Sequence, residues 1–133
     1  MIIISILTFK EFGLDESLIE GIEASGYENA TPVQEQVIPL ILNGQDIIAS
    51  AQTGTGKTAA FLLPIINRLL ASRHDDQINA LVIVPTRELA IQIAQNMEGL
   101  AYFTPISSIA VYGGGDGSNF STEKQAQIGR AHV

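Results

Sequence analysis

A glycine-rich turn stands in the first half of the chain, and it reads Ala51-Gln52-Thr53-Gly54-Thr55-Gly56-Lys57-Thr58. The residues before it, 46–50, are few, apolar and β-branched, which predicts a buried strand. The residues after it, from Lys57 to Ser72, predict a helix that Pro64 kinks. Glycines at such a turn let several backbone N–H groups point at one anion, and the helix N-terminus adds its positive end. The turn therefore predicts a phosphate-binding loop.

Two side chains of this loop are candidates for chemistry on a nucleoside triphosphate. We expect Lys57 to reach the β and γ phosphates and the Thr58 hydroxyl to bind Mg²⁺, which makes them the candidate catalytic residues. Residues 51–58 together are the candidate nucleotide-binding residues. The general pattern asks for glycine where Ala51 stands, a small residue that still fits. The alternative is a glycine-rich turn without a ligand.

Helical and strand patterns alternate along the chain. Helices are predicted over 15–26, 31–43 and 87–101, and further buried strands over 80–84 and 107–112. This alternation predicts an α/β fold with a parallel sheet flanked by helices. The strands are apolar without alternation because both faces of such a sheet are covered.

Composition narrows the class of protein. A length of 133 residues predicts one domain, and a charged share of 16% against 46% apolar residues excludes disorder as the main state. The absence of cysteine excludes a disulfide scaffold and cysteine-ligated metals, and two histidines are too few for a histidine-built metal site. No apolar run approaches a membrane span, so we expect a cytoplasmic protein without a membrane partner.

The net charge of −7 is concentrated in one part of the sequence. Residues 1–50 hold one base and eight acids, and the rest of the chain is balanced. No basic stripe exists, which on charge alone argues against binding to nucleic acid.

Three segments in a fixed order resemble one family. They are Gly-Tyr-x-x-Ala-Thr-Pro-Val-Gln at 26–34, the phosphate loop at 51–58, and Pro-Thr-Arg-Glu-Leu-Ala at 85–90. Together they resemble the first RecA-like domain of DEAD-box ATP-dependent RNA helicases, and bacterial members most. The resemblance runs from about Thr8 to Gly115. It implies a RecA-like phosphate-loop NTPase fold, ATP and Mg²⁺ as cofactors, and an enzyme that unwinds or remodels RNA duplexes.

The resemblance implies that Gln34 reads adenine. An amide offers a donor and an acceptor side by side, which matches N6–H and N7 of the base. Phe9 lies 17 residues before Gly26, the family's spacing for an aromatic ring that stacks on the base, whereas Phe12 is expected to serve packing. The alternatives are a core contact for Phe9 and a solvated helix position for Gln34. The family usually has proline where Ala30 stands.

The resemblance also implies RNA contacts at Pro85, Thr86, Arg87, Gly113 and Gly114. Thr86 is expected to cap the next helix, whose free N–H groups would hold RNA phosphates with help from Arg87. The glycine pair would offer further backbone N–H groups. Such contacts need no basic surface and ignore base identity, so we expect sequence-independent binding. The alternatives are a plain cap with Arg87 in an ion pair, and a plain turn.

Several parts of the family pattern do not occur in this sequence. No Asp-Glu pair follows the phosphate loop, so the Asp-Glu-Ala-Asp motif is missing, as is the second RecA-like domain with its arginine finger. Such a finger contributes roughly 10³–10⁵ in rate. The sequence therefore predicts a C-terminally truncated domain with negligible ATP turnover, and a second RecA-like domain as its missing partner.

The predicted organisation has three parts. Residues 1–7 are an N-terminal extension and residues 8–127 a partial helicase domain. Residues 128–133 fit no pattern and look like a translated sequencing adapter, which predicts a non-native tail rather than a native disordered one.

Two other functions stay open at this point. The first is another phosphate-loop enzyme, such as a DNA translocase or a small kinase, which a preference for duplex DNA would favour. The second is a non-catalytic nucleotide- or RNA-binding module, which a reading frame that stops at Val133 would favour.

Overall fold

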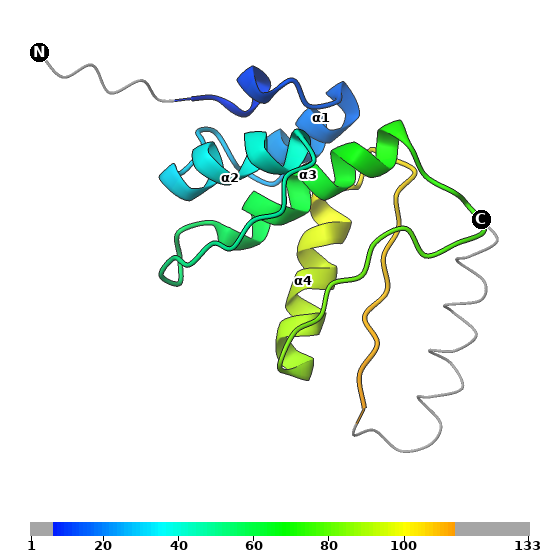
Figure 1. Ribbon diagram of the computed structural model, residues 1–133. Coiled ribbons are helices and arrows are strands. Elements are labelled where there is room, and N and C mark those ends of the chain that lie inside the picture. Colours follow the sequence, from blue (N-terminus) through cyan, green and yellow to red (C-terminus); the bar gives the residue numbers. More distant parts are fainter. Residues whose placement is uncertain (1–6, 114–133) are drawn as a thin grey trace, which may run out of the picture.

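The computed structural model describes residues 7–113, so the predictions for residues 1–6, for Gly114 and for the tail at 128–133 lie outside the described residues. Its elements are the 3-10 helix η1 (Phe9–Phe12) and the helices α1 (Glu16–Ala24), α2 (Pro32–Leu42), α3 (Lys57–Ala71) and α4 (Arg87–Leu100) (Figure 1). The helices predicted from the sequence are confirmed to within two residues. Within residues 7–113, no helix is long and apolar enough to cross a membrane.

Local capping residues explain where three of these helices begin. Their N-caps are Asp15 for α1, Thr31 for α2 and Thr86 for α4, and each side chain accepts a hydrogen bond from a first-turn N–H. Hydrogen bonds from the Ser17 hydroxyl and backbone N–H to the carboxylate lower the pKa of Asp15 below its usual 3.8. Each cap satisfies one donor that the helix itself leaves unpaired.

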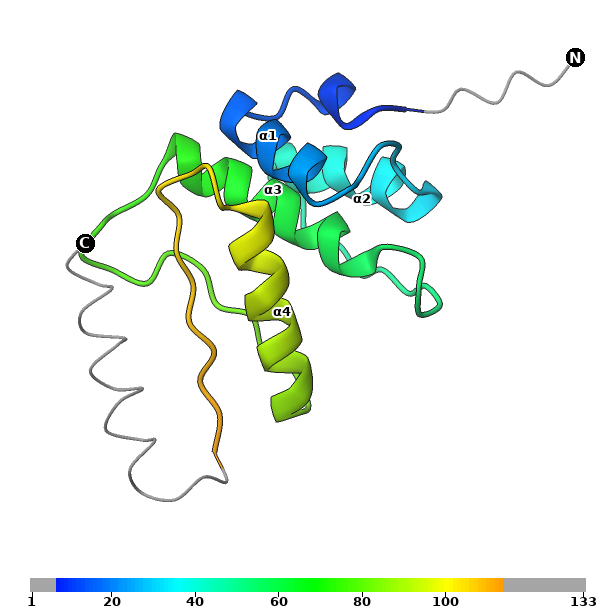
Figure 2. The same ribbon diagram turned by 180° about the vertical axis from the view of Figure 1, so that it is seen from behind.

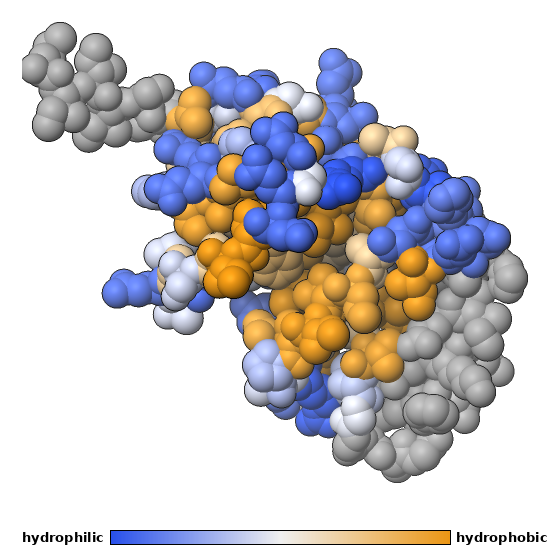
Figure 3. Space-filling model, in the orientation of Figure 1, coloured by the Kyte–Doolittle hydropathy of each residue, from blue (hydrophilic) through white to orange (hydrophobic). Residues whose placement is uncertain are grey.

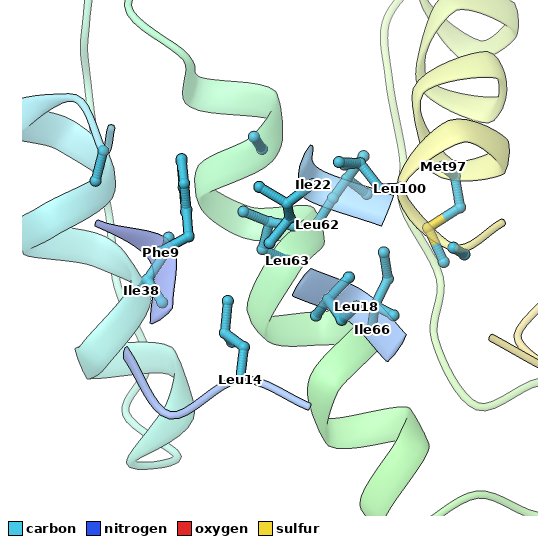
Figure 4. Close-up of a cluster of buried hydrophobic side chains, with 13 residues drawn as sticks. Phe9, Leu14, Leu18, Ile22, Ile38, Leu62, Leu63, Ile66, Met97 and Leu100 are labelled. Atoms are coloured by element: carbon cyan, nitrogen blue, oxygen red, sulfur yellow. The ribbon is translucent and has the colours of Figure 1, made fainter. Parts of the chain in front are cut away.

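Helix α3 lies at the centre of the hydrophobic core. It contacts α1, α2 and α4, and Figure 4 shows its side chains between those of the neighbouring elements. The members of the core with less than 2% of their surface exposed come from α1, α2 and α3. The apolar ones are Leu18, Ile22, Ile38, Leu62, Leu63, Pro64 and Ile66. Pro64 thus lies inside α3 without ending it.

The three segments predicted as strands, 46–50, 80–84 and 107–112, do not pair. Within residues 7–113 the only β-type pairing is an isolated antiparallel bridge between Thr8 and Asn29. The prediction of a hydrogen-bonded parallel sheet is therefore not met in the described residues. Residues 79–84 and 105–113 both line a hollow of about 800 Å³, and no backbone hydrogen bond joins one segment to the other. Neither segment therefore gains the partner that a strand needs.

The two extended segments that help to line this hollow lie on the same side of α4. Figures 1 and 2 show the segment that enters α4 and the segment that leaves it running along the helix in both views. Figure 3 shows apolar side chains gathered there. Leu81 and Ile83 of the entering segment are 77% and 84% exposed.

Candidate functional site

Two glycines and one hydroxyl shape the phosphate loop. Gly54 and Gly56 both have φ +83°, in the left-handed region that favours glycine. The Thr55 hydroxyl donates to the carbonyl oxygen of Gln52 at 2.6 Å, which closes the turn between them. The chain thereby reverses direction and enters α3, as the motif predicts, and Figure 1 shows this loop projecting from the start of α3.

The N-terminus of α3 differs from those of the other helices. Its N-cap is Gly56, which has no side chain to accept a first-turn N–H. Lys57 and Thr58 occupy the first two helical positions, with Lys57 exposed and Thr58 half-buried. Unpaired first-turn donors and the positive end of the helix dipole favour an anion. The loop is thus shaped for phosphate.

Gln34 connects the start of α2 to the end of the phosphate loop. Its side chain is 1% exposed, so the alternative of a solvated residue is wrong. Its Oε1 accepts from the Thr31 backbone N–H at 2.9 Å, and its Nε2 donates to the Gly56 carbonyl oxygen at 3.1 Å. Both ends of the amide are therefore engaged within the protein. Reading adenine stays a prediction, and it would use the second N–H and the second lone pair of this buried amide.

Phe9 lies in the core rather than at an open surface. It is 3% exposed and lies among the buried side chains of the core (Figure 4). Its ring centroid lies 6.1 Å from that of Phe12 and 6.0 Å from that of Tyr27. Phe12 is only partly buried against the same cluster. Stacking of Phe9 on a base stays a prediction, and it requires the ring to leave this position.

Leu7, which precedes η1, is hydrogen-bonded to residues in and beside the segment 26–34 that resembles the adenine-reading motif. The Leu7 carbonyl oxygen accepts from the Ala30 backbone N–H at 2.9 Å, and the Leu7 backbone N–H donates to Glu35 Oε1 at 3.3 Å. Sequence reasoning assigned no role to Glu35. The one available signal was its place in the first turn of α2, three residues after Pro32.

The predicted RNA-contacting residues come from two distant segments that the fold brings together. Thr86 caps α4 by accepting from the Leu89 backbone N–H at 3.2 Å, as predicted. The Arg87 guanidinium carbon lies 5.8 Å from the ring centroid of Tyr112, the neighbour of Gly113. Arg87 Nε also lies 3.5 Å from Glu88 Oε1, in the ion pair that the alternative interpretation expects.

Tyr112 was not singled out from the sequence. The sequence feature that could have pointed to it is its place as an aromatic residue directly before the run of glycines that starts at Gly113. Figures 1 and 2 show the first turn of α4 apart from the phosphate loop, so the nucleotide and RNA candidates form two separate places.

Comparison with known proteins gives a consistent result. The family model for DEAD/DEAH box helicases matches residues 31–133. The chain is 48% identical over 122 residues to ATP-dependent RNA helicase CshA of Listeria monocytogenes, covering 90% of this chain and 23% of that protein. It is 49% identical over 107 residues to DEAD-box ATP-dependent RNA helicase RhpA of Helicobacter pylori, covering 80% and 21%. The chain thus spans about a fifth of the length of these relatives.

Solved structures agree with the sequence comparison. The RNA-helicase Prp28 from Chaetomium thermophilum bound to ADP matches with a TM-score of 0.82 and 32% identity, over 98% of this chain and 32% of that one. A DEAD box protein from Methanococcus jannaschii matches with a TM-score of 0.72 and 34% identity, over 90% and 31%. The RecA-like fold class is therefore confirmed. The chain belongs to the DEAD/DEAH box helicase family.

Proposed function

We propose that this chain is the nucleotide-binding part of an ATP-dependent RNA helicase, an enzyme that uses ATP to unwind or remodel RNA duplexes. The observation that carries the proposal is the phosphate loop, whose two left-handed glycines lead into a helix without a side-chain cap. The names of the relatives support it, since those proteins are ATP-dependent RNA helicases. Because the chain spans about a fifth of their length, the activity belongs to the proposed parent protein.

The residues present fit ATP with Mg²⁺. Backbone N–H groups of residues 54–58 would surround the phosphates, Lys57 would neutralise the β and γ groups, and the Thr58 hydroxyl would bind the metal. Bound ATP would supply the phosphoanhydride bond whose hydrolysis drives remodelling. Gln34 would present the second N–H and the second lone pair of its amide to adenine, with Phe9 as the proposed stacking ring.

RNA is the proposed second ligand. Its backbone would lie on Pro85, Thr86 and Arg87 at the start of α4 and on Gly113, with Gly114 as a further proposed contact. The contact between Arg87 and Tyr112 supports this, because it brings the two segments to one place. We further propose a second RecA-like domain as partner and the cytoplasm as location, since the named relatives are bacterial RNA helicases.

Nucleotide binding tests the proposal. The chain is titrated with a fluorescent ATP analogue and Mg²⁺, and we expect Lys57→Ala to weaken binding at least about tenfold, the loss of one charge-assisted contact. Lys10→Ala is the matched control, because Lys10 is an exposed lysine paired with Glu23 away from the loop. Equal affinity of the wild-type chain and Lys57→Ala would contradict the proposal.

The same sample addresses the non-catalytic alternative. No Asp-Glu pair follows Thr58 in this sequence, so we expect the chain to bind ATP without measurable phosphate release. Turnover at a rate ordinary for an intact helicase would show that hydrolysis in this protein does not need that pair.

A further inference from the structure

The ring of Tyr112 lies against the guanidinium of Arg87. The two residues belong to segments that are distant in the sequence, so neither segment alone predicts this contact. Tyr112 is half-buried near the end of the extended segment 105–113, and Arg87 is the exposed first residue of α4. The distance from the guanidinium carbon to the ring centroid is 5.8 Å, within the range of cation–π attraction. This contact therefore links the two segments that carry the proposed RNA contacts.

Other contacts of Arg87 do not hold its guanidinium in place. Glu88 Oε1 lies 3.5 Å from Nε, but the two side chains are 47% and 76% exposed, and exposed pairs of this kind contribute little. Within residues 7–113, the terminal nitrogens of Arg87 make no hydrogen bond in the structure. The Tyr112 ring is thus the contact that limits where the long side chain can lie.

We propose that Tyr112 is a positioning residue that holds the Arg87 guanidinium beside the backbone of Gly113, so that one nucleic-acid strand meets both. The inference rests on the proposed RNA contacts. It adds a residue that acts through Arg87 and not by touching RNA. An aromatic ring is required for this role, whereas the phenolic hydroxyl is not. Tyr112→Phe should therefore keep the function that Tyr112→Leu loses.

The first measurement needs no RNA. In the NMR spectrum of the wild-type chain, the side-chain protons of Arg87 should be shifted upfield by the ring current of Tyr112. The shift should persist in Tyr112→Phe and disappear in Tyr112→Leu, whose other resonances report that the chain is still folded. An Arg87 spectrum that is the same in the wild type and in Tyr112→Leu would overturn the inference.

The second measurement is the affinity of each variant for a fluorescein-labelled oligouridylate at low ionic strength, by anisotropy. Tyr112→Leu should bind about two- to fivefold more weakly, the ordinary worth of an exposed cation–π contact. Tyr112→Phe should match the wild type. Tyr102→Leu is the control, because Tyr102 is an exposed tyrosine beyond the far end of α4.

A double-mutant cycle separates positioning from direct contact. If Tyr112 acts through Arg87, Tyr112→Leu has no further effect in an Arg87→Gln background. An undiminished loss in that background, or a loss in Tyr112→Phe equal to that in Tyr112→Leu, would overturn the positioning role while leaving RNA binding intact. A wild-type chain that does not bind the oligonucleotide would instead refute the proposed RNA contacts, and the inference with them.

Discussion

Two independent constraints meet at Gly56. Its φ of +83° lies where side chains are strained, and a Cβ there would overlap Gln34 Nε2 and lie 3.1 Å from Gln34 Cδ. Gly54 has the same φ, but a Cβ there would meet open space. A substitution at Gly54 therefore reports backbone strain alone, whereas the same substitution at Gly56 reports strain together with the lost contact of the Gln34 amide.

We expect Gly54→Ala to lower the free energy of unfolding by about 1–2 kcal/mol, the cost of the left-handed conformation. Gly56→Ala should cost a further ~1–3 kcal/mol, because the buried Gln34 amide loses its place against the Gly56 carbonyl. Urea denaturation measures both values. In a Gln34→Ala background the difference between the two glycine variants should shrink to what the 3.3 Å approach to the Thr31 hydroxyl oxygen leaves. Equal losses in the wild-type background would mean that Gln34 does not support the loop.

The sequence predicted which residues form the site, but it did not predict which other residues contact them. Gly54, Gly56 and Lys57 follow from a local pattern, since a phosphate loop is formed by consecutive residues. The bond from Gln34 to Gly56 joins residues 22 apart, and no pattern within either segment reports it. The burial of Phe9 is likewise set by Phe12 and Tyr27, one of which lies beyond α1.

Among the helices, α1 and α4 make an unusually close approach at Gly21. A Cβ on Gly21 would overlap the backbone carbonyl oxygen of Leu100 and lie 2.9 Å from its carbonyl carbon. Gly99, one residue earlier in α4, would place a Cβ only 3.5 Å from the Ser25 hydroxyl oxygen, which is ordinary contact. The spacing of these two helices therefore depends on the absence of a side chain at one position.

Gly21→Ala should destabilise the chain by about 1–3 kcal/mol, because backbone atoms must move to admit the methyl group. Gly99→Ala should leave stability unchanged or raise it by up to about 1 kcal/mol, since alanine is the better helix former. Thermal unfolding followed by circular dichroism compares the two. A gain in stability for Gly21→Ala would show that α1 and α4 do not cross at this distance.

Helices were predictable and strand pairing was not, for a physical reason. The ends of α1 and α2 follow from Asp15, from Thr31-Pro32 and from Gly44, which act on backbone groups within one turn. A strand becomes a strand only when a neighbour accepts and donates its backbone bonds. Residues 80–84 and 107–112 have the right composition, but no backbone hydrogen bond joins them, although both line the same hollow.

At the scale of the whole molecule, the apolar side chains form two groups, one buried in the core and one exposed to solvent. The side chains around α3 are buried, whereas Ile48, Leu81 and Ile83 on the unpaired segments are exposed by 77% or more. Parallel sheets are normally covered on both faces, and unpaired strand edges attract other chains. Exposed apolar groups of this extent favour association with other polypeptide surfaces.

We therefore expect the chain by itself to associate with further copies as its concentration rises, with sedimentation velocity as the measurement. Leu81→Thr combined with Ile83→Thr should reduce this association, because it removes apolar area without changing the net charge or the tendency to stay extended. Neither side chain belongs to the buried core, so the melting temperature should be unchanged. Tyr102→Ser removes an equally exposed apolar residue outside the hollow and should leave association as it was. If both variants sediment as the wild type does, the open segments are not the surface that brings copies together.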